Sequence, residues 1–119
     1  MMAQSNPEGP LVVVAVLQAK PGLGPRIIEH FREVAPLVHQ EPGCELYAAH
    51  LQQGGDAVVM VERWSSPAAL AGHASGAALA RLNELNEGML EKPYDVWRLD
   101  NVPLGDPAKA TIPPTTEEP

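Results

Sequence analysis

The segment from Leu11 to Leu17 constrains the fold most, because all seven of its residues are apolar and four are valine. Its β-branched residues, bounded by Pro10 and by Lys20-Pro21-Gly22, predict a strand over residues 11–17. The segment Ala57–Trp64 predicts another strand, again with apolar residues of both parities. Successive strand residues point to opposite faces of a sheet, and strands with one solvent-exposed face alternate in polarity. Both faces of this sheet are therefore predicted to be covered by protein.

Between these strands, the spacing of apolar residues predicts a helix that begins at Pro25 and runs to Val38. Pro36 removes one backbone amide from that pattern, so we expect a kink or an early end there. Residues 44–51 predict a strand that pairs with residues 57–64 through the turn residues 52–56. The middle of the chain is therefore expected to be a β-hairpin.

The second half of the chain predicts one more helix and one more strand. Ser65 or Ser66 is expected to cap a helix with Pro67 in its first turn, and residues 68–90 are rich in helix formers. Gly72 and Gly76 are expected to divide this helix into two pieces. Alternating polarity over residues 94–99 predicts the last strand.

The order of these segments is βαββαβ, which predicts a ferredoxin-like α+β domain with an antiparallel sheet and both helices on one side. We expect the domain to span residues 11–102, after a flexible N-terminus (1–10) and before a Pro-rich, flexible or docking tail (103–119). The helices can cover only one face of the sheet. The other face is expected to be covered by an identical chain, giving a homodimer with its sheets packed face to face.

Composition narrows the function classes. A length of 119 residues predicts one domain. A net charge of −7 with 8 Lys and Arg argues against a nucleic-acid partner. No apolar run reaches the length of a membrane span, and no export signal is expected at the N-terminus. The lone Cys44 cannot form an internal disulfide, which favours a soluble protein of the reducing cytoplasm.

Several short motifs occur together in a characteristic order. Glu62-Arg63-Trp64 ends a strand and precedes a short helix that carries His73, while Lys20-Pro21-Gly22 follows the first strand. Glu41-Pro42-Gly43-Cys44 leads into the strand that contains Tyr47. From Leu11 to Val102, this arrangement resembles the antibiotic biosynthesis monooxygenase family, in its quinol monooxygenase branch.

The resemblance implies a dimeric ferredoxin-like α+β barrel, with a pocket in each subunit between the sheet and the helices. It also implies a monooxygenase that oxidises a quinol or polycyclic phenol-type substrate with molecular oxygen, without a cofactor. Such chemistry needs a protein that holds the substrate, ionises it and keeps it dry, because an electron-rich phenolate can then pass an electron to oxygen.

Candidate residues for these tasks follow from their chemistry. His73 is the expected general base, because imidazole titrates near neutral pH. Trp64 is the expected pocket wall and indole donor, and Tyr47 can hold a substrate oxygen. His50 is a second candidate acid or base, and Glu62 shares the strand parity of Trp64, so it is expected to orient a neighbour or pair with an arginine. Each also has a structural interpretation, in which Trp64 is core, His73 bonds to a backbone carbonyl and Glu62 lies at a sheet edge.

Haem-degrading members of the same family use a strand asparagine, a helical tryptophan and a helical histidine that binds iron. This chain carries Leu17, His73 and Asn83 at the corresponding positions, so haem degradation is disfavoured and no metal site is expected. Leu17 and Asn83 are instead expected to contact substrate. A second class of function remains open, because a fold does not determine a function. In it, the dimer binds a small aromatic or signalling molecule without catalysis, or acts as an isomerase.

Overall fold

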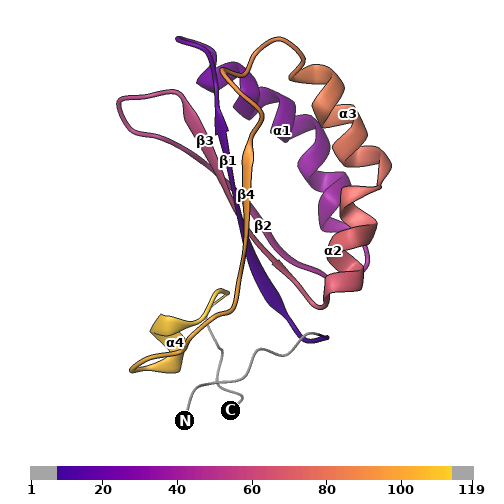
Figure 1. Ribbon diagram of the computed structural model, residues 1–119, viewed down its shortest axis with the longest axis vertical. Coiled ribbons are helices and arrows are strands. Elements are labelled where there is room, and N and C mark those ends of the chain that lie inside the picture. The colour runs from indigo at the N-terminus through magenta and orange to yellow at the C-terminus, as the bar shows by residue number, and fades with distance from the viewer. Residues whose placement is uncertain (1–7, 114–119) are drawn as a thin grey trace.

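The computed structural model describes residues 8–113, so residues 1–7 of the predicted flexible N-terminus and 114–119 of the predicted tail lie outside the described residues. The elements follow the predicted order, with the second helix divided in two and a short helix added near the C-terminus (Figure 1). They are β1 (Leu11–Gln18), α1 (Gly24–His39), β2 (Cys44–Leu51), β3 (Ala57–Trp64), α2 (Pro67–Ala74), α3 (Ala77–Leu85), β4 (Asp95–Leu99) and α4 (Pro107–Ala110).

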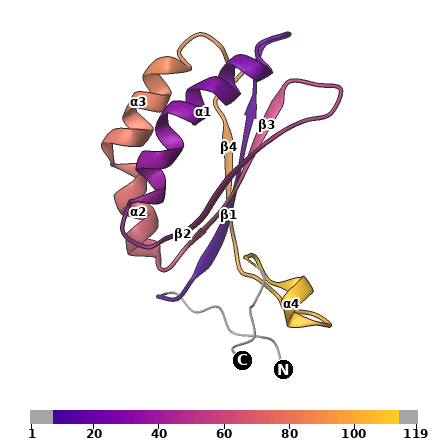
Figure 2. The same ribbon diagram turned by 180° about the vertical axis from the view of Figure 1, so that it is seen from behind.

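The four strands form one antiparallel sheet in the order β2-β3-β1-β4. Helices α1, α2 and α3 all lie on one side of it, as Figures 1 and 2 show from opposite directions. Val13 pairs with Glu62 and Val14 pairs with Val61, so register assigns alternate residues to the two faces. Val13 and Glu62 belong to the helix-covered face. The prediction of a ferredoxin-like α+β fold is confirmed.

Helix α1 packs its apolar side against the covered face of the sheet. Ile27, Val34 and Val38 are completely buried there. The helix continues through Pro36 to His39, so the expected early end at that proline is wrong. A proline inside a helix costs about 3 kcal/mol. Complete burial of Val34 and Val38, on either side of it, stabilises the helix by about 1.5–3 kcal/mol each, which outweighs that cost.

The second helical region is divided into α2 and α3 at Gly76, one of the two glycines at which the sequence predicts a break. Ser66 caps α2, since its Oγ accepts a hydrogen bond from the Ala69 amide at 3.1 Å. Gly76, in extended conformation, begins α3, whereas Gly72 lies within α2. Helix α2 has one buried residue, His73. Ala69 and Leu70 pack against the core only partly buried, so His73 is the most deeply buried contact of this helix.

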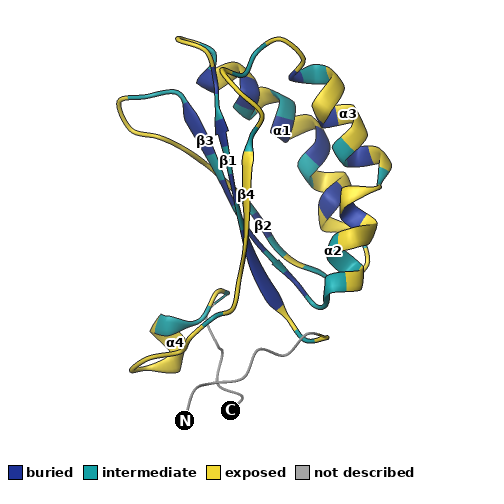
Figure 3. Cartoon of the chain, in the orientation of Figure 1, coloured by how far each residue is buried: buried dark blue, intermediate teal, exposed yellow. Residues whose placement is uncertain are grey.

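The opposite face of the sheet is apolar and partly exposed. Helices α1, α2 and α3 leave it uncovered, and the segment with α4 lies beside one end of it (Figures 1 and 3). Register places Val14, Val61 and Trp97 together on this face, with Leu99 further along β4. Trp97 is 56% exposed and Leu99 42%. This surface, which we call the open face, is the one that the sequence predicts to be covered by a second copy.

The described part of the tail folds back onto its own domain. Asn101 donates to the Ala110 carbonyl at 2.9 Å and accepts from the Ile112 amide at 3.3 Å. Arg63, at the end of β3, donates to the Ile112 carbonyl at 3.0 Å. Residues 103–113 are therefore tied to the sheet, and the prediction that the tail docks on a partner remains a prediction. In the described residues, we find no helix that is both long and apolar enough to cross a bilayer.

Asp56 connects the hairpin to the start of α1. Its two carboxylate oxygens accept hydrogen bonds from the amides of Gly22 at 2.9 Å and Gly24 at 3.0 Å. These two bonds hold the pKa of the Asp56 carboxyl below its usual value. Gly22 has φ +82°, a conformation that favours glycine.

We expect Asp56→Asn to lower the urea midpoint of unfolding at neutral pH, because the amide has one acceptor oxygen instead of two. The folded-state pKa is depressed, so the stabilising effect is complete above the unfolded pKa, about 3.9. It disappears as pH falls through the folded-state value, and the midpoints of wild type and variant should then converge. Asp95→Asn is the control, since Asp95 makes only an exposed ion pair with Lys92 at 3.1 Å. A midpoint gap that persists in acid would contradict this assignment.

Candidate active site

A cavity of about 140 Å³ lies between the covered face of the sheet and the three helices. Its lining is mostly apolar and comes from all four strands and from α1, α2 and α3, with Tyr94 just before β4. The polar residues of the lining are Tyr47, Glu62, His73 and Tyr94. An apolar cavity with a few polar groups facing inward is the usual form of a small-molecule site.

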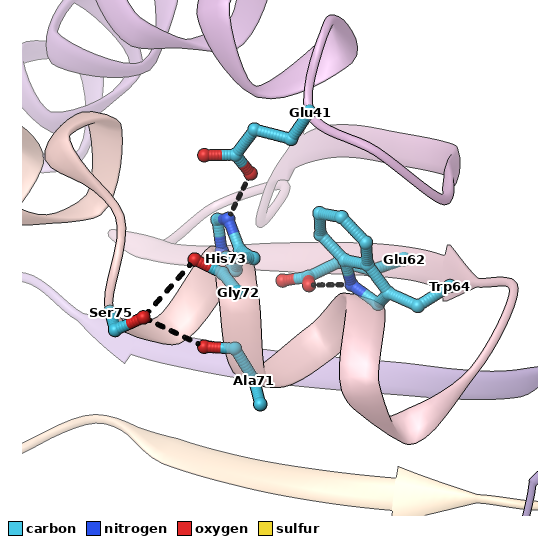
Figure 4. Close-up of polar contacts among 7 residues, drawn as sticks. All are labelled: Glu41, Glu62, Trp64, Ala71, Gly72, His73 and Ser75. Carbon is cyan, nitrogen blue, oxygen red and sulfur yellow. Dashed lines mark hydrogen bonds and ion pairs between the residues drawn. The ribbon is translucent and has the colours of Figure 1, made fainter.

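His73 is the central polar residue of this lining. It is 5% exposed, and its Nδ1 lies 2.7 Å from Glu41 Oε1 (Figure 4). A carboxylate only accepts, so Nδ1 carries the hydrogen of this bond. The Nε2 atom has no hydrogen-bond partner among residues 8–113, which leaves it as the nitrogen open to a ligand. Glu41 therefore fixes both the orientation and the tautomer of the imidazole.

The imidazole also stacks on an aromatic ring. The centroids of His73 and Trp64 are 4.7 Å apart, with 27° between the ring planes. Trp64 is completely buried behind His73 and does not line the cavity, because it lies at the far end of β3 beneath α2. The structure therefore gives Trp64 a supporting position rather than the expected position in the wall.

The turn before β2 brings Glu41 to α2. Gly43 has φ +80°, and its carbonyl accepts from the Ser65 amide at 2.8 Å. A Cβ at Gly43 would collide with the Ala69 Cβ and with the Ser65 side chain. Only glycine fits this turn without rearrangement, since both the conformation and the close approach exclude a side chain. The Glu41-Pro42-Gly43 motif thus positions the carboxylate that orients His73.

Glu62 is a second buried acid in the cavity lining. It is 5% exposed, and its Oε1 accepts a hydrogen bond from Trp64 Nε1 at 2.8 Å (Figure 4). Burial raises the pKa of the Glu62 carboxyl, and the indole bond and the nearby His73 oppose only part of that rise. Of the two arrangements expected for Glu62, the structure shows contact with a neighbour, Trp64, rather than with an arginine.

Tyr47 lies beside the same imidazole. Its ring meets that of His73 edge-on, with the centroids 5.4 Å apart. Within the described chain, no hydrogen bond engages its hydroxyl, and no completely buried side-chain polar atom lacks a partner. The hydroxyl therefore remains available for a hydrogen bond with a ligand. Burial, with the charges of Glu62 and Glu41, raises the pKa of Tyr47 far above its usual value, so it acts as a neutral donor.

The other predicted site residues separate into two groups. Leu17 lines the cavity. His50 lies on the open face, exposed, with its Nδ1 at 3.1 Å from the Val59 carbonyl oxygen. Asn83 is exposed on α3, beside a separate surface depression. The structure thus brings Leu17, Tyr47, Glu62 and His73 together around the cavity, supported by Trp64, and leaves His50 and Asn83 outside it.

Two residues of the site were missed from the sequence. Glu41 was noted only as part of a turn motif, although an acid before a Pro-Gly turn was its available signal. Tyr94 lines the cavity from the segment before β4, and nothing in its sequence context distinguished it. Across residues 8–113, no cluster of three or more His, Cys, Asp or Glu is arranged to hold a metal ion.

The sequence profile described as antibiotic biosynthesis monooxygenase matches residues 10–85. The chain belongs to this family. The resemblance predicted from the Glu62-Arg63-Trp64 and His73 motifs is confirmed.

Several proteins are similar to this chain in sequence or in structure. The chain is 28% identical to the "Probable quinol monooxygenase YgiN" of Escherichia coli, across 66% of this chain and 86% of that protein. A solved antibiotic biosynthesis monooxygenase is 29% identical with a TM-score of 0.71, covering 78% of this chain and 99% of that one. PA3566 from Pseudomonas aeruginosa, at 24% identity, shares the fold with a TM-score of 0.72, covering 82% and 99%.

Proposed function

We propose that this chain is a monooxygenase that oxidises a small quinol or related phenol with molecular oxygen. The observation that carries the proposal is the Glu41–His73 pair, which presents one imidazole nitrogen to an apolar cavity. Membership in the antibiotic biosynthesis monooxygenase family and the name of the Escherichia coli relative support the same reaction class.

In the proposed reaction, the substrate hydroxyl lies against His73 Nε2, which takes its proton. Tyr47 donates a hydrogen bond to a substrate oxygen from the same side of the cavity. The apolar lining excludes water, so the phenolate is poorly solvated and gives an electron to oxygen more readily. The electron-rich phenolate supplies the reducing power itself, and we therefore propose that no metal or flavin takes part.

The size of the cavity favours a small substrate. An apolar protein cavity of about 150 Å³ accommodates a single benzene ring. The cavity here, about 140 Å³, should therefore enclose one ring of the substrate. Further rings of a polycyclic phenol would have to extend out through the mouth. We therefore propose that one-ring and two-ring quinols are better substrates than polycyclic phenols.

The test is oxygen uptake by the purified protein with benzohydroquinones, naphthohydroquinones and anthrone, in the presence of a metal chelator. We expect uptake above the buffer rate with at least one quinol, and ¹⁸O from labelled oxygen in the organic product. Saturable binding of these compounds without uptake would overturn the proposal, and would leave the binding function as the better interpretation.

We further propose that two copies pack together through the open face. The exposed apolar side chains of Trp97 and Leu99 support this, since a monomer would leave them in water. We expect a dimer in sedimentation at micromolar concentration and a monomer for Trp97→Glu. Leu37→Glu, on the helix side, is the control, because Leu37 is equally exposed at 55% and should leave the dimer intact. A stable wild-type monomer would rule this out.

The reducing cytoplasm is the location that we propose. Cys44, the one cysteine of the sequence, is free in the structure, which suits a compartment that keeps thiols reduced. Cell fractionation with a compartment marker tests this, and recovery with periplasmic markers would contradict it.

A further inference from the structure

The reaction proposed above leaves one buried titratable group of the cavity without a role. Glu62 lines the cavity, and only its Oε1 is engaged, by the indole of Trp64 at 2.8 Å. No residue of the described chain hydrogen-bonds its other oxygen, and that oxygen is not a completely buried unpaired atom. It is therefore open to the cavity. Because Oε1 accepts the indole hydrogen, a proton on this carboxyl would be on the oxygen that faces the ligand.

The surroundings of Glu62 favour its protonated form more than those of an exposed carboxyl would. The carboxyl is 5% exposed, and burial together with the negative charge of Glu41 raises its pKa. The other titratable groups that interact with it are His73, Tyr47 and Cys44. A proton on His73 would favour the charged form of Glu62. The acid strength of Glu62 should thus increase once His73 has taken the substrate proton.

We propose that Glu62 is a catalytic acid that protonates the peroxide formed on the substrate, so that the second oxygen atom leaves as water. This inference rests on the proposed monooxygenase function. It assigns a chemical step to a carboxyl that the sequence suggested only as an orienting or structural group.

The proposed reaction converts the quinol and oxygen into an oxygenated product and water through a peroxide on the ring. His73 takes the hydroxyl proton of the quinol, the resulting anion gives one electron to oxygen, and the radical pair joins at a ring carbon that bears hydrogen. Glu62 then protonates the distal oxygen of this peroxide. The Glu62 carboxylate takes the proton from that carbon, whose electron pair forms a carbonyl as the O–O bond breaks. The departing hydroxide takes the proton from His73, giving water, and both residues return to their starting states.

Without the acid, the same peroxide has a different outcome. The distal oxygen then takes the proton of the second quinol hydroxyl, and no carboxylate is present to remove the ring proton. The electron pair left on that hydroxyl oxygen forms the second carbonyl and breaks the C–O bond, and the hydroperoxide anion that leaves takes the proton from His73. The products are then the simple quinone and hydrogen peroxide, which contain together all the atoms of the quinol and oxygen. Glu62 is thereby assigned control over whether the enzyme inserts oxygen or only removes hydrogen.

The decisive variant is Glu62→Gln, which preserves side-chain size and an oxygen for the Trp64 indole but has no acidic proton. We expect it to take up oxygen while releasing about tenfold or more hydrogen peroxide per oxygen consumed, in line with the usual contribution of a general acid. Incorporation of ¹⁸O into the product should fall correspondingly. Glu33→Gln is the matched control, since Glu33 pairs with Arg81 on the exposed helix surface at 2.8 Å and should leave both the uptake and this partition unchanged.

Glu62→Leu is a second variant of similar volume that lacks any polar group, and it should also release hydrogen peroxide. Unchanged product partition in whichever of the two variants folds, checked by circular dichroism, would overturn the assignment while leaving the monooxygenase function intact. A wild-type protein that consumes no oxygen with any quinol would overturn both proposals.

Discussion

His73→Ala should lower kcat/KM for oxygen uptake by about 10²–10⁴-fold, the range that a general base contributes. The variant removes the cavity nitrogen that we propose as the acceptor of the substrate proton, and no other residue of the lining contacts Glu41 in the same way. The measurement is the initial rate with the best quinol of the panel, at several pH values. Partial recovery of the rate with added imidazole would connect the loss to the missing base.

The matched control for this variant is His50→Ala. His50 is a histidine on β2. It lies on the open face of the sheet, with its Nδ1 near the Val59 carbonyl oxygen. Its removal should leave the rate near that of the wild type. Since His73 is also the most deeply buried residue of α2, thermal unfolding of both variants must accompany the kinetics. A folded His73→Ala protein with the wild-type rate would exclude His73 as the base.

Trp64→Ala should produce the largest loss of stability, about 3–5 kcal/mol in the free energy of unfolding. The indole is completely buried, packs against the His73 ring, and donates the hydrogen bond that Glu62 accepts. Trp64→Phe retains most of the packing but leaves a buried carboxyl oxygen without its donor. It should therefore cost less, about 1–3 kcal/mol.

Urea unfolding monitored by circular dichroism measures both effects at one protein concentration, because a dimer makes stability depend on concentration. Leu104→Ala is the control, since Leu104 is 77% exposed and its loss should remain within about 0.5 kcal/mol. A loss below about 1 kcal/mol for Trp64→Ala would mean that the indole contributes little to the core.

Most of the fold could be predicted from the sequence because its signals are local. The valines of Leu11–Gln18 and the Ser66 cap each determine structure within a few residues of themselves. Pro36 shows the limit of such reasoning. A local rule predicts an early end of α1, but burial of the residues beside it is a tertiary effect that a single sequence does not display.

The site was less predictable, since its residues meet only after folding. Glu41 and His73 are 32 residues apart, and their partnership depends on how the Gly43 turn packs against α2. His50 could have been excluded by parity, because it is three residues from Tyr47 on one strand and must point to the other face. Asn83 could not have been excluded from the sequence, since the rotation of α3 about its axis is determined by tertiary packing.

The single buried residue of α2 has a consequence for the timing of the reaction. This helix forms part of the cavity wall, and its one buried residue is also the residue that we propose takes the substrate proton. A protonated imidazole binds a carboxylate more strongly than a neutral one does. In the proposed reaction, the contact of His73 with Glu41 is therefore strongest while His73 carries the substrate proton, and it weakens when that proton leaves with the product water.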